Sequence, residues 1–100
     1  MSNDIAKRVL EFCELSSLIN HDTNDFFPAS YYEDPSNGPL LTKKISDWNI
    51  KTYDDWDNIM RNEIRWVIKN KKQVLQVLPP ISKEWPEACK SIRTLLQMAK

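Results

Sequence analysis

The sequence predicts an all-α fold: a small helical bundle of three main helices around a long central helix, with a long irregular aromatic loop between the first helix and the central helix. Three observations support this fold class. Residues 53–78 repeat apolar side chains at helical spacing, and residues 4–19 and 83–99 each do so over a single face. No stretch alternates apolar and polar side chains for more than a few positions, as a half-buried strand would. One hundred residues suffice for one domain, so we expect residues 1–100 to form a single α-helical domain.

The first and last helices are each predicted to pack against the core along one side. The first is expected over about residues 4–19, with apolar side chains every three or four positions. These are Ile5, Val9, Phe12, Cys13, Leu15 and Ile19. The last helix is expected over about residues 83–99, with Ser82 as its cap and Pro86 in its first turn, where proline is tolerated.

The central helix is expected over about residues 53–78. Thr52 can accept from the free N–H groups of the first turn with Asp55 as its capping-box partner, and Pro79-Pro80 is predicted to stop the helix because proline has no N–H to donate. The apolar side chains cover an arc of roughly 200°, so the helix is predicted to be covered from two sides. The helix has one weak position, Lys-Asn-Lys-Lys at 69–72, where polar side chains interrupt the apolar arc. A bend or break there would leave a short second helix over 73–78.

Glu63 falls near the middle of the apolar arc of the central helix. An acid in such a place has to be paired, protonated or at a rim. Burial would raise its pKa, as in a general acid, but the sequence offers no second acid, base or nucleophile to work with it. We therefore expect a structural acid with a partner, or one that opens onto an interface.

Residues 20–51 lose helical periodicity and are predicted to be irregular, with a short helical turn near residues 42–48. Gly38, the only glycine of the chain, is predicted to supply a positive φ in a proline-flanked turn. Four aromatic residues within seven positions argue that this segment is ordered, because disordered chains are poor in such residues.

Charge is unevenly distributed although the net charge is zero. Residues 1–34 hold seven acids against Lys7 and Arg8, a balance of minus five, so the remainder carries plus five. We expect the acidic third to fold back on the basic remainder; the alternative is that each region meets a partner of opposite charge. No run approaches the roughly 18 apolar residues of a membrane span, and the N-terminus lacks the apolar centre of a signal peptide, which predicts a cytoplasmic protein without membrane contact.

The sequence offers no catalytic, metal or cofactor motif. Cys13 and Cys89 fall on apolar helix faces, where reduced thiols usually act as small core residues, so a disulfide between them is possible but disfavoured. Neither belongs to a metal-binding pair. His21 is the only histidine, and the residues after it begin like a calcium loop but place Phe26 where a ligand is needed. A single glycine excludes the glycine-rich phosphate loops. We therefore expect no enzyme activity, no catalytic residue, no metal and no cofactor.

The favoured function is a small cytoplasmic protein-binding module of the inhibitor, immunity or adaptor type, which acts by stoichiometric binding of a protein partner. Aromatic residues on a proline-stiffened loop give a large contact area at low ordering cost, and carboxylates beside them favour a basic partner. The predicted partner-binding residues are Phe26, Phe27, Tyr31, Tyr32, Glu33 and Asp34. The alternative for this segment is that the two phenylalanines cover the bottom of the core and only the tyrosines reach water.

Two further hypotheses concern other surfaces. Nucleic-acid binding would use a basic face of the central helix, whose members are spaced by four, four and three residues. These are Arg61, Arg65, Lys69 and Lys72. The near-neutral pI and the acidic first third make nucleic acid the less favoured partner. The third hypothesis is a homodimer or larger homo-oligomer with a structural role, because four tryptophans, three tyrosines and three phenylalanines are many for so small a core.

Overall fold

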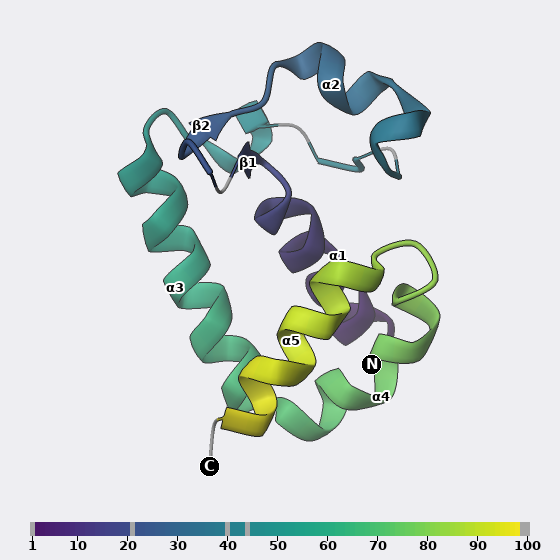
Figure 1. The fold of residues 1–100 in the computed structure, drawn as a ribbon. Helices are drawn as coiled ribbons and strands as arrows, with labels where there is room; N and C mark the ends of the chain where they lie inside the picture. Colours follow the sequence, from purple (N-terminus) through teal and green to yellow (C-terminus); the bar gives the residue numbers. More distant parts are fainter. Residues whose placement is uncertain (1, 21, 40, 44, 99–100) are drawn as a thin grey trace.

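The computed structural model describes residues 2–20, 22–39, 41–43 and 45–98, and most of these residues are helical, which confirms the all-α class (Figure 1). The elements in chain order are α1 (Ser2–Ser16), β1 (Ile19–Asn20), β2 (Asp25–Phe26), α2 (Ala29–Glu33), the 3-10 turns η1 (Pro35–Asn37) and η2 (Ile45–Trp48), α3 (Tyr53–Lys69), α4 (Lys71–Ile81) and α5 (Pro86–Met98). His21, and with it the start of the calcium-like sequence, lies outside the described residues.

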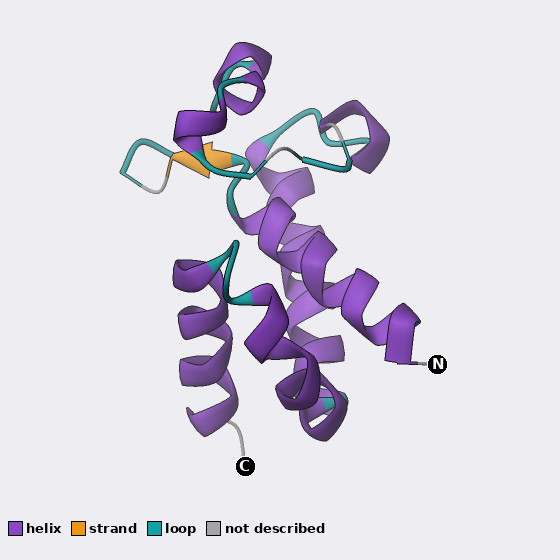
Figure 2. Ribbon diagram, turned by 90° about the vertical axis from the view of Figure 1, so that its right-hand side faces the viewer, coloured by secondary structure: helices purple, strands orange, loops and turns teal. Residues whose placement is uncertain are grey.

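The molecule has two layers, which Figures 1 and 2 show from two sides. The helices α1, α3, α4 and α5 form a lower layer, and the short elements from β1 to η2 form an upper layer over one end of α1. The segment predicted to be irregular thus contains short regular pieces. Its two strands pair antiparallel, with Ile19 opposite Phe26 and Asn20 opposite Asp25. Within the described ranges, no helix combines the length and the apolar character needed to cross a lipid bilayer.

Helix α1 ends at Ser16, three residues before the predicted end at 19. Two serine hydroxyls compete with the helix backbone at this point, as short polar side chains often do. Ser16 Oγ donates to Cys13 O at 2.8 Å, and Ser17 Oγ donates to Glu14 O at 2.7 Å. The chain beyond them leaves the helix and carries Leu18 into the upper layer.

The predicted start of the central helix is confirmed by the geometry at Thr52. Thr52 Oγ1 accepts from the backbone N–H of Asp55 at 3.2 Å, and Asp55 Oδ2 accepts from the backbone N–H groups of Thr52 at 3.1 Å and Lys51 at 2.9 Å. These backbone hydrogen bonds favour the carboxylate and lower the pKa of Asp55. The capping box therefore fixes where α3 begins.

The chain breaks at the weak position predicted at 69–72, so residues 53–78 do not form one continuous helix. Asn70 lies between α3 and α4 with φ −110° and ψ 34°, outside the helical region. Both its side-chain Nδ2 and its backbone N–H donate to Trp66 O, at 2.9 and 3.0 Å, so the asparagine closes the last turn of α3. Helix α4 leaves in a different direction (Figure 1) and is longer than the second piece expected over 73–78.

The predicted stop at Pro79-Pro80 is wrong, since α4 continues through both prolines to Ile81. Prolines in the last turn remove only the hydrogen bonds that their own N–H groups would have made. The backbone N–H of Ser82, after the two prolines, still donates to Leu78 O at 2.8 Å. The Ser82 hydroxyl donates to Pro79 O at 2.8 Å, so Ser82 ends α4 and does not cap the last helix. Helix α5 starts at Pro86, at the first helical position, where proline fits.

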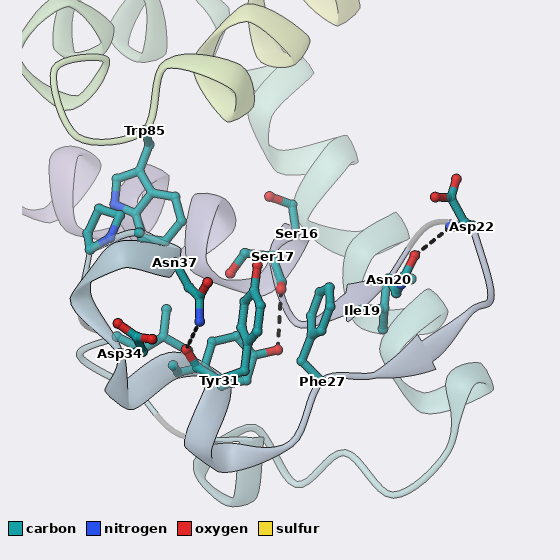
Figure 3. Close-up of a pocket in the computed structure, with 14 residues that line it drawn as sticks. Ser16, Ser17, Ile19, Asn20, Asp22, Phe27, Tyr31, Asp34, Asn37 and Trp85 are labelled. Atoms are coloured by element: carbon teal, nitrogen blue, oxygen red, sulfur yellow. Dashed lines mark hydrogen bonds between the residues drawn. The ribbon is translucent and has the colours of Figure 1, made fainter.

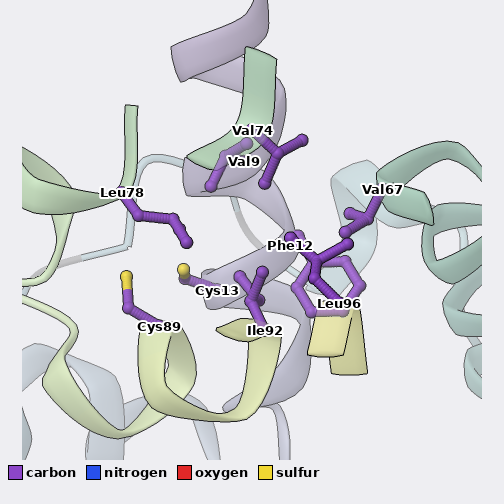
Figure 4. Close-up of a cluster of buried hydrophobic side chains, with 9 residues drawn as sticks. All are labelled: Val9, Phe12, Cys13, Val67, Val74, Leu78, Cys89, Ile92 and Leu96. Carbon is purple, nitrogen blue, oxygen red and sulfur yellow. The ribbon is translucent and has the colours of Figure 1, made fainter. Parts of the chain in front are cut away.

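Two clusters of buried apolar side chains stabilise the layers. The main core joins α1, α3, α4 and α5 (Figure 4) and consists of Val9, Phe12, Cys13, Val67, Val74, Leu78, Cys89, Ile92 and Leu96. The upper core joins the end of α1 to the upper layer and to the start of α3, and consists of Leu15, Leu18, Ile19, Ile50 and Trp56. Met60 packs against both clusters, so the two cores are in contact through α3.

Glu14 is the buried polar residue that fastens the upper layer to α1. Its side chain is 1% exposed, and its Oε1 accepts from the backbone N–H groups of Thr42 and Lys43, the second at 3.2 Å. Its Oε2 accepts from Thr42 Oγ1 at 2.6 Å. Three donors offset the cost of removing the carboxylate from water. The apolar periodicity of the sequence gave no indication of this role.

Glu63 has a partner, as expected for a structural acid. Arg8 of α1 donates to it twice, from Nε to Oε2 at 3.2 Å and from Nη2 to Oε1 at 3.3 Å. The same guanidinium lies over the Trp66 ring, 4.4 Å from its centroid. Among the described residues, one ion pair joins an acid of the first third to a base of the remainder, between Glu11 Oε2 and Lys43 Nζ at 3.9 Å.

Replacing Glu14 by Gln is expected to lower the free energy of unfolding by about 2 kcal/mol, because hydrogen bonds to a charged group contribute roughly 1.5–3 kcal/mol and an amide nitrogen cannot accept. Urea unfolding followed by circular dichroism measures the change. Glu11→Gln is the matched control one turn earlier, with an expected effect below about 0.5 kcal/mol since its ion pair is partly exposed. Equal effects of the two changes would contradict the role given to Glu14.

A second prediction concerns Trp56, whose indole Nε1 donates to Leu15 O at 2.8 Å inside the upper core. Trp56→Phe is expected to reduce the free energy of unfolding by about 1–3 kcal/mol beyond the loss of ring area, because the carbonyl loses a buried donor. Trp48→Phe is the control, since the Trp48 Nε1 is buried without a hydrogen-bond partner among the described residues. If Trp48→Phe proved as costly as Trp56→Phe in a urea titration, the indole hydrogen bond would not be the cause.

Candidate functional site

A cleft of about 400 Å³ lies between the two layers (Figure 3). One wall comes from the end of α1 and from residues within 27–39 together with Leu41, and the other from Trp85 in the turn between α4 and α5. Figure 3 shows the Trp85 ring pointing from that turn toward the segment that carries Asp34 and Asn37. We call this hollow the aromatic cleft.

Three rings form one wall of the aromatic cleft. Phe27 and Tyr31 are stacked, with centroids 4.2 Å apart and planes 9° apart. Tyr32 presents its edge to both, at 5.4 Å and 84° from Tyr31 and at 6.2 Å and 86° from Phe27. Stacked and edge-to-face pairs are the favoured arrangements of aromatic rings. The wall is therefore a packed group of rings, and its shape is set before any partner binds.

The ring cluster is attached to the end of α1 by hydrogen bonds. The Tyr32 hydroxyl donates to Leu18 O at 2.8 Å and to Ser17 O at 3.3 Å, and the Phe27 backbone N–H donates to Leu18 O at 3.2 Å. Burial, with a smaller contribution from Tyr31, raises the pKa of Tyr32 to about 12. The phenol therefore remains a neutral donor at physiological pH.

A second set of contacts shapes the turn at the mouth of the cleft. Asp34 Oδ1 accepts from Ser36 Oγ at 2.8 Å and from the Ser36 backbone N–H at 3.0 Å, and these bonds lower the pKa of Asp34. Asn37 Nδ2 donates to Tyr31 O at 3.0 Å. Gly38 has φ 129°, which confirms the predicted need for glycine in this turn. Asp34 is thus a fixed, charged carboxylate beside the rings.

Two carboxylates are among the residues that line the aromatic cleft. Asp34 and Asp22 line it, and Asp25 and Glu33 are exposed nearby in the sequence. The described residues of this segment carry no basic side chain between Asp22 and Pro39. The wall of the aromatic cleft formed by this segment is therefore acidic, and carboxylates attract cations.

The structure brings four of the six predicted binding residues together and places two elsewhere. Phe27, Tyr31, Tyr32 and Asp34 line the aromatic cleft. Phe26 pairs with β1 and packs on the upper core, and Glu33 is exposed at the end of α2 but does not line the cleft.

Sequence reasoning missed Trp85, which completes the opposite wall. The spacing of its neighbours placed Trp85 on the apolar stripe of the last helix. In the structure, Trp85 precedes α5 in the turn after α4, and its indole is only partly buried. No local signal could have paired it with residues more than forty positions earlier.

The basic row of the nucleic-acid hypothesis is divided by the helix break. Arg61, Arg65 and Lys69 lie on α3, whereas Lys72 lies on α4, so the premise of one continuous face is wrong. Arg61 Nε donates to Asp57 Oδ2 at 2.8 Å, and this hydrogen bond and the carboxylate charge raise the pKa of the arginine. Nucleic-acid binding through these residues stays a prediction.

The homo-oligomer hypothesis needs apolar surface that a second copy would cover. The exposed large apolar side chains among the described residues are distributed over three helices: Tyr53, Ile68, Leu75 and Met98. Single exposed apolar side chains are normal on soluble proteins. Homo-oligomerisation therefore stays a prediction.

No group of three or more His, Cys, Asp or Glu side chains is placed to hold a metal ion within the described part of the chain. Comparisons with protein-family models, with curated proteins and with solved structures find no match to this chain. The chemistry of the aromatic cleft is consequently the main guide to function.

The raised pKa of Tyr32 gives a pH-dependent prediction. A tyrosine in the unfolded chain ionises near pH 10, whereas Tyr32 in the folded protein ionises at about 12. The folded state keeps the neutral form, so this contribution to stability is complete below about pH 10 and is lost between about pH 10 and 12. Absorbance titration should show one late-ionising tyrosine, absent in Tyr32→Phe. A late phase that persists in Tyr32→Phe would assign the shift to another residue.

Proposed function

We propose that the chain is a small protein-binding module of the inhibitor, immunity or adaptor type, which binds a protein partner stoichiometrically through the aromatic cleft. The observation that carries this proposal is the cleft itself: stacked Phe27 and Tyr31 on one wall, Trp85 on the other, and Asp34 and Asp22 among its lining residues. Binding of this kind needs no catalytic residue, metal or cofactor from the chain.

The chemistry of the aromatic cleft favours a basic segment of the partner. A guanidinium or ammonium group is attracted to the face of an aromatic ring and pairs with a carboxylate, and both groups are present here. The hydrogen bonds that lower the pKa of Asp34 keep its charge from neutral pH down to mildly acidic pH. A hollow of about 400 Å³ accommodates one or two side chains, so the partner would insert a short segment.

The rings of the cluster are already packed before a partner binds, and this supports tight binding. Side chains that are already packed lose little rotamer freedom when a partner arrives, so less of the contact energy is spent on ordering them. Tyr32 is held by its two hydrogen bonds, and Tyr31 is held by its stacking on Phe27. Tyrosine and tryptophan are also the residue types that most often dominate binding energy at interfaces.

A cytoplasmic location is part of this proposal. Cys13 and Cys89 are free and buried thiols, which is the usual state of cysteine in reducing compartments. The alternative, nucleic-acid binding through α3, has the weaker support because its basic row is interrupted at Asn70 and Arg61 is paired with Asp57.

The test is an NMR titration of the folded protein with a capped peptide of alternating arginine and glycine, against a glutamate–glycine peptide of equal length. The arginine peptide is expected to shift resonances of Phe27, Tyr31, Asp34 and the Trp85 indole. Tyr31→Ala should weaken this binding about tenfold, the usual effect of truncating an interface hot spot, and Tyr31→Phe should weaken it less because the stacked ring is kept. Tyr31 is the better target since Tyr32 also supports the upper core.

Two results would contradict the proposal. One is equal binding of the arginine and glutamate peptides, which would mean that the acidic surroundings of the cleft do not select. The other is binding that Tyr31→Ala leaves unchanged while circular dichroism stays helical. A parallel titration with a DNA duplex at two salt concentrations tests the alternative, because phosphate contacts from Arg65 and Lys69 would make affinity fall steeply with salt.

A further inference from the structure

The main core contains both cysteines of the chain. Cys13 of α1 and Cys89 of α5 are each 0% exposed and belong to the same apolar cluster. Figure 4 shows the two sulfur atoms turned toward each other between the helices. Each thiol also contributes to the shift of the other's pKa. Two residues far apart in the sequence are therefore neighbours in the folded core.

The surroundings distinguish the two thiols. Burial is the main cause that raises the pKa of both, and for Cys13 the proximity of Cys89 and Glu14 raises it further. For Cys89, the Cys13 side chain and the charge of Arg93 act in the opposite direction. The positive charge of Arg93 thus favours the thiolate form at Cys89.

We propose that Cys13 and Cys89 form a modification site, at which a reversible intramolecular disulfide ties α1 to α5 when the chain meets a low-molecular-weight organic disulfide. The chemistry is thiol–disulfide exchange, which needs a thiolate and an accessible sulfur. Because both sulfurs are buried, the exchange requires a local opening of the fold. Neither cysteine lines the aromatic cleft, although the hollow described below shares Ser16, Ser17 and Trp85 with it.

The exchange balances in two steps. The Cys89 thiolate attacks one sulfur of the small disulfide, forms a mixed disulfide and releases one small thiolate, which takes up a proton. The Cys13 thiolate then attacks the Cys89 sulfur and releases the second small thiolate, which is also protonated. The two protein thiols are oxidised to one disulfide, and the small disulfide is reduced to two thiols.

A second hollow leads toward this pair. It has a volume of about 530 Å³, lies between α1, α3 and α5, and is bordered by Cys13 together with Met60, Ile64, Ala88 and Leu95. The small disulfide would enter from this side, where Cys13 but not Cys89 borders the hollow, and a local opening of α5 would expose the Cys89 sulfur to it. The new bond would then fix the two helices that form two walls of this hollow.

The disulfide is expected to stabilise the fold strongly. It would close a loop that covers most of the chain, and the loss of unfolded-state entropy grows with loop length. For a domain of this size the expected rise in Tm is on the order of 15 °C.

The experiment incubates the folded protein with glutathione disulfide and follows mass and thiol content under native conditions. The expected product is a monomer lighter by two hydrogen atoms, without bound glutathione, with no alkylatable thiol and with the higher Tm. Excess dithiothreitol should reverse both changes. Cys89→Ala and Cys13→Ala, each checked by circular dichroism, should give no such product.

Other products would overturn the proposal. These are a chain that retains bound glutathione, a covalent dimer, or thiols that react only after urea has unfolded the protein. The outcome is independent of peptide binding, since the aromatic cleft and the cysteine pair are read out by different measurements.

Discussion

Burial of one helix, α1, is the constraint on which the rest of the structure depends. Three consecutive residues near its end are 0–1% exposed and face three different neighbours, because successive side chains on a helix point about 100° apart. Cys13 packs into the main core beside Cys89. Glu14 binds the backbone of the upper layer at Thr42, and Leu15 enters the upper core while its carbonyl accepts from Trp56. A helix surrounded in this way positions every other element.

The aromatic cleft follows from this arrangement. Its rings are fixed to the end of α1 by Tyr32, and its other wall is carried by the turn that leads into α5. The two walls belong to different layers, yet both layers are anchored on the same helix. The distance between Tyr31 and Trp85 is therefore controlled by packing inside the cores, although both side chains are partly open to solvent.

Local features were predictable from the sequence because their causes are local. The Thr52 capping box, the positive φ of Gly38 and the first-turn position of Pro86 each depend on residues within a few positions. The weak position of the central helix was also visible, but whether it bends or breaks depends on Asn70 closing the last turn of α3 onto Trp66 O.

Features that depend on distant partners could not be predicted in the same way. The buried role of Glu14 requires Thr42, twenty-eight positions away, and apolar periodicity does not report it. Pro79 and Pro80 were expected to end the helix because proline has a low helix propensity. In the structure the helix continues past them, and the backbone N–H of Ser82 donates to Leu78 O. Most of the candidate site was found because aromatic residues cluster in the sequence. Trp85 was not, since only the tertiary structure brings it to the cleft.

The composition of the chain around the rings has a consequence for the cost of folding this region. The chain has one glycine and six prolines, and Pro28, Pro35 and Pro39 stand in the segment that forms the aromatic wall. Each proline restricts its own φ and the residue before it, so the unfolded segment samples fewer backbone conformations than an average loop of equal length. Its ordering loses correspondingly less entropy, which helps to explain how a stretch with so little regular secondary structure can hold three rings in fixed register.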